Sequence, residues 1–241
     1  MMNDVFYHYI VYVFFIASLV VLGTLVCKFC FRRFLFSCGT NFFLNLSLKL
    51  LLGFITVVSV TAIVITRGKT IYLFTLLLLL LGAFIRTKLE YGIKPIQISS
   101  GKPKDYLLVF FVFTLIFVWH YLGTNYSGDM MFYAKVSNAL MDYGVENYKA
   151  IYYEYRPVKG ILLYHYGELW LTGIISRIMD TSSLNVLIYF TYPFFHGLTL
   201  ISLIGVFVSK GFATLKSFLV SVAVLYGISI IQYQIFIIPH Q

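Results

Sequence analysis

The chain contains few charged residues. Lys, Arg, Asp and Glu together make up 11% of the 241 residues, whereas hydrophobic residues make up 60%. Soluble domains contain about 25% charged residues, so this shortage argues against an ordinary soluble protein. Several apolar stretches reach the roughly 20 residues that a helix needs to cross the hydrocarbon core of a bilayer. We therefore expect an all-α, polytopic integral membrane protein.

Cysteine is also scarce. The cysteines are Cys27, Cys30 and Cys38, and an odd number gives no complete disulfide framework. Cys27 and Cys30 have the spacing of a zinc-binding pair, but a structural zinc site needs four ligands and no second pair follows. We interpret them as a thiol pair at a membrane edge. The sequence also lacks a nucleophile elbow, a P-loop and a dinucleotide-binding fingerprint, which argues against the enzyme classes that use them.

Basic residues outnumber acidic ones, and the formal net charge is +9. The sequence has no basic run interleaved with exposed aromatic residues and no known nucleic-acid-binding motif, so nucleic acid is not an expected partner. In a membrane protein the simpler explanation is that Lys and Arg gather in cytoplasmic loops. The first ten residues contain neither Lys nor Arg, so the first apolar stretch is predicted to be an uncleaved helix rather than a signal peptide.

Apolar length predicts about seven membrane spans. They cover residues 5–27, 46–66, 71–86, 106–123, 161–178, 185–208 and 217–239. A turn-rich linker at 91–105 is predicted to divide an N-terminal three-helix segment (1–90) from the rest of the chain (106–241). The last stretch stays apolar almost to Gln241 without a charged anchor, so we expect the polypeptide to be truncated there.

Positive charge in the loops predicts the orientation. The loops after the first and third spans carry Lys and Arg, which places them in the cytoplasm and the N-terminus outside. The segment 124–160 then also lies outside. The span at 161–178 leaves two alternatives. In the first, which we favour because Arg177 suits a cytoplasmic end, the segment crosses fully and Lys210 and Lys216 lie outside. In the second, the segment only dips into the membrane and both lysines lie in the cytoplasm.

The outer loop 124–160 contains a predicted amphipathic helix that begins near Asp129 and ends at Gly144. Its apolar side chains recur at the i, i+4, i+7 and i+8 positions, opposite the polar ones. The apolar stripe consists of Phe132, Val136, Ala139, Leu140 and Tyr143, and the polar face of Lys135, Asn138 and Asp142. We expect this interfacial helix to rest on the membrane surface.

Asp129 has two interpretations. A carboxylate at the start of a helix caps free N–H groups and meets the positive end of the helix dipole. It can also act as a general base or as a metal ligand at the membrane surface. The two roles are compatible, because a capping carboxylate is held in place.

A resemblance covers roughly residues 125–205. The stretch "DMMFYAKVSNALMDYGVENY", followed by "RPVKGILLYHYGELWLTGIIS", is similar to the first outer loop of the polytopic type C glycosyltransferases, which include protein mannosyltransferases and lipid A aminoarabinose transferases. These enzymes have an acidic residue after an early span, a Tyr four positions later, a Gly, a Pro-containing turn and an aromatic-rich helix. Here Asp129, Tyr133, Gly144, Pro157 and the helix from Tyr164 follow that order.

The resemblance implies a transferase that uses a sugar donor carried on polyprenyl phosphate. It makes Asp129 the catalytic carboxylate, either as general base on the acceptor or as ligand of a divalent ion such as Mg²⁺ or Mn²⁺. Tyr133 belongs to the same motif and becomes a candidate substrate-binding residue. Arg156 and Lys159 flank Pro157 and are candidates for the donor phosphate, with anchoring at the interface as the alternative.

The sequence departs from the family pattern at two positions. Met130 stands where relatives often have a second acidic residue, and Val158 stands where they have a second proline. The family usually has more spans as well. These differences fit either an incomplete chain or a diverged protein without catalysis.

His165 and Glu168 lie three residues apart at the start of the fifth predicted span, on one face of a helix. A charge at the centre of a membrane helix costs about 2.5–3.5 kcal/mol, but the first two turns are within reach of water and headgroups. These residues either make a structural contact with each other or line a substrate cavity beneath the outer loop. His8, His120 and His196 stand alone on apolar or interfacial stretches, and we interpret them as packing or interface residues.

Three functions follow from these observations. The first is a glycosyltransferase that moves a sugar from a lipid-linked donor to an acceptor on the extracytoplasmic face, in the inner (plasma) membrane of a bacterium and in contact with its lipids. The second is a transporter or flippase of lipid-linked saccharides, which calls for more ionisable residues within the spans. The third is a non-catalytic membrane subunit or a fragment.

Overall fold

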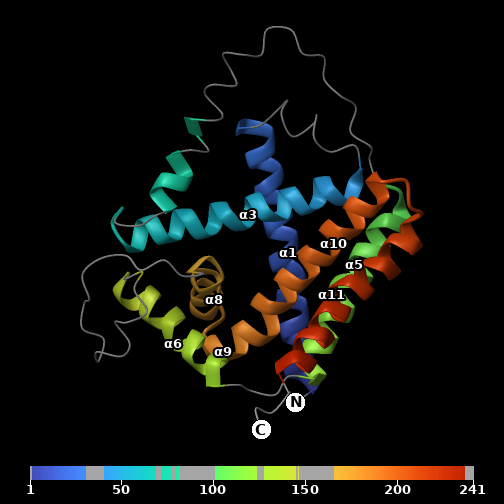
Figure 1. The fold of residues 1–241 in the computed structure, drawn as a ribbon. Helices are drawn as coiled ribbons and strands as arrows, with labels where there is room; N and C mark the ends of the chain where they lie inside the picture. Colours follow the sequence, from blue (N-terminus) through green and yellow to red (C-terminus); the bar gives the residue numbers. More distant parts are fainter. Residues whose placement is uncertain are drawn as a thin grey trace, which may run out of the picture.

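The computed structural model describes residues 2–30, 41–68, 72–77, 80–81, 101–123, 128–144, 146 and 166–236. In these ranges the regular elements are all helical, which confirms the all-α prediction for this part of the chain (Figure 1). They are α1 (Met2–Cys30), α3 (Phe42–Ile65), α5 (Pro103–Gly123), α6 (Gly128–Tyr143), α8 (Tyr166–Met179), α9 (Ser183–Val186), the π-helical turn η1 (Leu187–Thr191), α10 (Tyr192–Ser209) and α11 (Thr214–Phe236).

Four helices are long and apolar enough to cross a membrane. They are Val5–Cys27, Phe42–Ile65, Pro103–Gly123 and Ser183–Ser209, the last of which joins α9, η1 and α10. α11 adds a shorter apolar stretch, Thr214–Tyr226. These helices support a membrane protein, but the predicted count of seven spans is not confirmed within the described residues. Half of the predicted span at 71–86 and most of the linker at 91–105 lie outside them.

α8 covers the part of the predicted fifth span that the structure describes. It has 14 residues, which make a helix of about 21 Å, and residues 161–165 of the predicted span lie outside the described residues. Its last turn returns to the outer-loop helix, because Arg177 forms an ion pair with Asp142 of α6. Ser183, the first residue of α9, donates a hydrogen bond to Asn138 of α6. The favoured full crossing is therefore not confirmed, and the geometry matches the alternative in which this segment only dips into the membrane.

The helix ends gather at two opposite ends of the molecule. At one end Asn41, just before α3, donates a hydrogen bond from Nδ2 to the carbonyl of Gly205 near the end of α10 (2.6 Å). The residues just before α5 pack against the same first turn of α3. At the opposite end Gly144, which follows α6, lies against Ile65 at the end of α3. α3 therefore connects the two ends, and α10 runs between them in the reverse direction (Figure 1).

Charge divides between these two ends. The basic end carries Lys102, Lys104, Lys210 and Lys216, with Asp105 among them. The acidic end carries Asp129, Asp142, Glu146, Glu168 and Asp180, together with Arg67, Lys135 and Arg177. Lys210 and Lys216 lie at the same end as the starts of α3 and α5. A full crossing by α8 would put these two lysines outside, against the positive-inside rule. If α8 only dips into the membrane, they lie on the same side as the other lysines of the basic end, as the rule expects.

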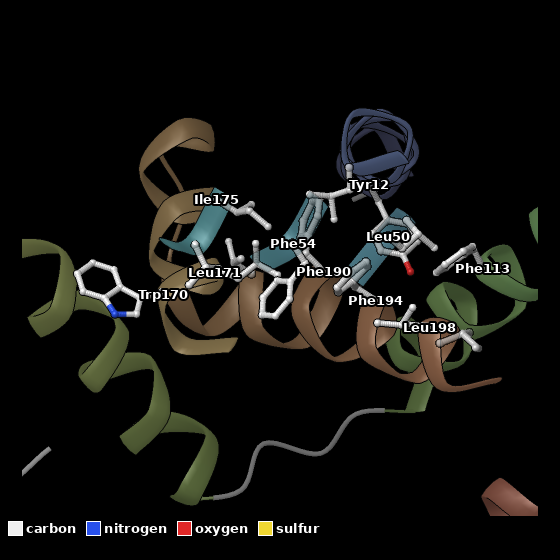
Figure 2. Close-up of a cluster of buried hydrophobic side chains, with 14 of the residues drawn as sticks. Tyr12, Leu50, Phe54, Phe113, Trp170, Leu171, Ile175, Phe190, Phe194 and Leu198 are labelled. Carbon is white, nitrogen blue, oxygen red and sulfur yellow. The ribbon is translucent and has the colours of Figure 1, made fainter. Parts of the chain in front are cut away.

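The hydrophobic core follows α10 (Figure 2). Phe190, Phe194 and Leu198, spaced one turn apart, are buried and join side chains from α1, α3, α5 and α8 in one cluster. The fully buried ring of Tyr12 in α1 contacts Phe190 and also Phe113 of α5. Aromatic pairs of this kind contribute about 0.5–1.5 kcal/mol beyond their burial. The first two described helices therefore share one core with the rest of the molecule.

α1 and α3 cross at glycines. A Cβ on Gly23 would lie 1.8 Å from the carbonyl oxygen of Lys49, and a Cβ on Gly53 would lie 2.1 Å from that of Leu19. In membranes, close packing rather than the hydrophobic effect drives helix association, and small residues allow the backbones to approach. The crossing therefore requires glycine at both positions.

Replacing Gly53 by Ala is expected to destabilise this crossing, because the methyl group forces the two backbones apart. Overpacking of a tight contact costs typically about 1–3 kcal/mol. The matched control is Gly123→Ala at the end of α5, where an added Cβ meets no atom of the described residues within 4 Å. Thermal unfolding in detergent should give a lower midpoint for Gly53→Ala and an unchanged one for Gly123→Ala. Equal midpoints would contradict the close crossing.

Candidate functional site

α6 places Asp129 at the acidic end. The helix starts at Gly128 and is closed by Gly144, which has a left-handed φ of 62° and donates its N–H to the carbonyl of Leu140 (2.9 Å). These bounds confirm the predicted outer-loop helix. Asp129 is exposed and lies within the first turn rather than at the N-cap. Its carboxylate therefore meets the positive end of the helix dipole, and its capping of free N–H groups stays a prediction.

The apolar stripe of α6 packs on α8. Val136, Ala139 and Leu140 are buried, Phe132 is half-buried, and Tyr143 is exposed together with Lys135, Asn138 and Asp142. The two helices approach closely, since a Cβ on Gly173 of α8 would lie 2.9 Å from the carbonyl oxygen of Ser137. The predicted amphipathic pattern is thus largely present, but the stripe contacts protein where a membrane surface was expected.

Tyr192 brings three of the predicted site residues together. Glu168, Tyr133 and Asp129, in order of decreasing strength, interact electrostatically with its phenol group. Tyr133 follows Asp129 by one turn of α6, so both occupy the same helix face. Glu168 lies in the first turn of α8. Tyr133, Glu168 and Tyr192 are half-buried. The predicted residues therefore lie within electrostatic range of a tyrosine that sequence reasoning missed.

The other predicted site residues are Arg156, Lys159 and His165, which lie outside the described residues. Binding of the donor phosphate by Arg156 and Lys159 stays a prediction. The contact between His165 and Glu168, and their shared role in lining a cavity, also stay predictions.

A π-helical turn sets the position of Tyr192. η1 (Leu187–Thr191) comes directly before Tyr192 and Pro193. Proline has no N–H, and its ring clashes with the carbonyl four residues earlier in an α-helix, so a wider turn accommodates it. Thr191 at the end of the turn is hydrogen-bonded through Oγ1 to Oγ1 of Thr172 in α8 (2.8 Å). Such π-turns are frequent at functional sites.

Two histidines lie near Tyr192. His120, in the last turn of α5, and His196 of α10 form a hydrogen bond between Nε2 and Nδ1 (2.8 Å). The ring centre of His120 lies 6.5 Å from that of Tyr192. The interpretation of these histidines as isolated packing residues was therefore incomplete, although an ionisable residue in a span is a functional candidate by default. We call the whole group the Tyr192 cluster: His120, Asp129, Tyr133, Glu168, Tyr192 and His196.

A buried carboxylate fixes the chain just after α6. Glu146 is 3% exposed and accepts a hydrogen bond from Nε1 of Trp170, which is fully buried in α8 (3.0 Å). Tyr72 interacts electrostatically with Glu146 and with Tyr166, the first residue of α8. A buried charge needs such partners, since leaving it unpaired is costly. This contact ties Glu146, just after α6, to α8.

A polar cleft lies between α6 and the turn that joins α8 to α9. One cavity of about 560 Å³ is lined by Asn138, Asp142, Tyr143, Ser176, Arg177, Asp180 and Thr181. A second, of about 390 Å³, shares Asn138, Ser176, Asp180 and Thr181 and extends along α6 to Met131. Amide, hydroxyl and charged groups converge on this cleft, which suits a ligand rich in hydroxyl groups.

Among the described residues, no group of three or more His, Cys, Asp and Glu side chains is placed to hold a metal ion. The described residues around Asp129 thus do not supply the oxygen ligands that Mg²⁺ or Mn²⁺ would require, and we derive no step through such an ion. The role of Asp129 as a metal ligand stays a prediction.

A scan against family models, a search of curated proteins and a search of solved structures each found no significant match to this chain. The resemblance to type C glycosyltransferases therefore rests on the residues of the outer loop. The placement of Asp129, Tyr133 and Glu168 around Tyr192 is a separate observation, because it depends on how three helices pack.

Proposed function

We propose that this protein is a membrane glycosyltransferase that moves a sugar from a polyprenyl-phosphate donor to an acceptor at the acidic end. The proposal is supported by the placement of Asp129, Tyr133 and Glu168 within electrostatic range of Tyr192. Asp129 and Tyr133 are the residues that the type C motif singles out, and Glu168 comes from a separate helix. Polar groups that converge near a membrane edge are a default candidate for a substrate site.

In this proposal Asp129 is the general base. Its exposed carboxylate takes the proton from an acceptor hydroxyl as the hydroxyl oxygen attacks the anomeric carbon. The bond from that carbon to the donor phosphate breaks, and the polyprenyl phosphate leaves with the electron pair. Tyr133 and Tyr192 offer hydroxyl groups that donate or accept hydrogen bonds with the sugar.

The proposal includes an orientation. The basic end faces the cytoplasm, because Lys102, Lys104, Lys210 and Lys216 gather there and positive residues are retained on that side. The acidic end, with the Tyr192 cluster, then faces outside, and so does the N-terminus. This arrangement suits the inner membrane of a bacterium, where a lipid-linked donor in the outer leaflet reaches the cluster.

The test is a transfer assay with the full chain in proteoliposomes. A set of radiolabelled polyprenyl-phosphate sugars is supplied together with an extract of bacterial envelope as the source of acceptors. Protein-dependent transfer of label from the donor to the acceptor fraction is expected, and empty liposomes give the background. Movement of intact donor across the bilayer without transfer would contradict the proposal and favour a flippase. A folded protein that leaves every donor unchanged would favour a non-catalytic subunit.

A further inference from the structure

His120 and His196 direct two imidazole nitrogens at each other from different helices. Nε2 of His120 lies 2.8 Å from Nδ1 of His196, and the ring centres are 4.9 Å apart with the planes tilted by 34°. His196 is partly open to solvent, at the level where α5 ends. Two neutral imidazoles share one proton in this arrangement, since one nitrogen donates and the other accepts. A metal ion that displaces this proton and lies to one side of the line between the two nitrogens can bind both, because neutral imidazole nitrogen is a common metal ligand.

The spacing of the two nitrogens selects the coordination geometry. Imidazole nitrogens lie about 2.0–2.1 Å from a bound ion. Two such nitrogens 2.8 Å apart subtend an angle of about 86° at the ion, which is close to the right angle between neighbouring ligands of Cu²⁺ or Ni²⁺ in tetragonal sites. A tetrahedral Zn²⁺ site would need the nitrogens to be about 3.3 Å apart.

We propose that His120 and His196 form a two-histidine site for a divalent ion with the geometry of Cu²⁺ or Ni²⁺. No third His, Cys, Asp or Glu joins them among the described residues, so water or a small ligand fills the remaining positions. Bound there, the ion ties the end of α5 to α10 beside Tyr192. The two histidines belong to the Tyr192 cluster, but their metal binding does not depend on sugar transfer.

The experiment uses the full chain, purified in detergent without a polyhistidine tag and with its thiols alkylated. Cu²⁺ is titrated, and electron paramagnetic resonance reports the nitrogens bound to it. At substoichiometric copper the spectrum is expected to show hyperfine splitting from two equivalent imidazole nitrogens, and the titration is expected to saturate at one ion per chain. Ni²⁺ is expected to raise the thermal unfolding midpoint of the same protein.

His120→Gln and His196→Gln remove one ligand each. Loss of even an outer-shell partner weakens metal binding by roughly 10–100-fold, so each variant is expected to bind at least about tenfold more weakly. The matched control is His8→Gln, because His8 contacts the rings of Tyr189 and Phe190 and lies outside the pair. The proposal would be overturned if the copper spectrum of the wild type showed no coupling to two nitrogens, or if all three variants bound copper equally. The pair would then be only a hydrogen bond between two helices. The wild-type spectrum decides the question even if a variant fails to fold.

Discussion

Replacing Asp129 by Asn is expected to lower sugar transfer by about 10²–10⁴-fold, which is the usual contribution of a general base. Asn has nearly the same shape as Asp, but its amide does not accept the acceptor's proton at neutral pH. The fold should persist, because Asp129 is exposed and loses only its interaction with the helix dipole, worth about 0.3–1 kcal/mol. The variant should therefore insert into the membrane and bind the donor while the rate of transfer collapses.

The matched control for this substitution is Asp105→Asn. Asp105 also lies in the first turn of a helix, α5, where its Oδ2 accepts a hydrogen bond from the backbone N–H of Lys102 (2.9 Å). It sits at the basic end, away from the Tyr192 cluster, so transfer should remain near the wild-type rate. Wild-type transfer by Asp129→Asn would remove Asp129 from the mechanism. An equal loss in both variants would show that only the stability of the protein had changed.

The largest effect on stability is expected for Trp170→Ala. The Trp170 side chain is fully buried in the core, and truncation of a buried Trp costs about 3–5 kcal/mol of the free energy of unfolding. The change also removes the Nε1–H that binds the carboxylate of Glu146. Trp170→Phe separates the two contributions, because it keeps most of the buried ring and leaves Glu146 without this hydrogen bond, at a cost of about 1–3 kcal/mol.

Unfolding in detergent, followed by circular dichroism, measures both effects. Trp119→Ala is the control, since the side chain of Trp119 is 64% exposed on α5. We expect the midpoints to fall in the order wild type, Trp170→Phe, Trp170→Ala, with Trp119→Ala close to the wild type. If the two Trp→Ala variants had equal midpoints, the contact between α8 and Glu146 would not stabilise the outer loop.

The sequence predicted the positions of helices correctly where the local residue pattern alone determines the helix. Apolar length located α1, α3, α5 and the run from Ser183 to Ser209, and Gly144 marked the end of α6 because only a left-handed residue closes the helix there. Asp129, Tyr133 and Glu168 were selected from their types and spacing, and the structure brings them to one place.

The contacts that complete the site depend on tertiary packing, which no local pattern encodes. Arg177 looked like a cytoplasmic anchor, but its partner is Asp142, which lies 35 positions earlier in the chain. His120 and His196 are separated by 76 positions, and each alone resembles a packing residue in an apolar helix. Apolar length also favoured a full crossing for α8, since buried packing on α6 and a membrane crossing select the same residue types.

The central claim is that α8 returns to the acidic end, so that α6 and the α8–α9 turn lie on the outer side and the α10–α11 turn lies in the cytoplasm. Sided labelling tests it with single cysteines at Lys135, Thr181 and Lys210, in a chain whose native cysteines are replaced by Ser. Spheroplasts are treated with a membrane-impermeant maleimide before and after permeabilisation. We predict that Lys135→Cys and Thr181→Cys label in intact spheroplasts and that Lys210→Cys labels only after permeabilisation. Labelling of Lys135→Cys and Thr181→Cys from opposite sides would contradict the account.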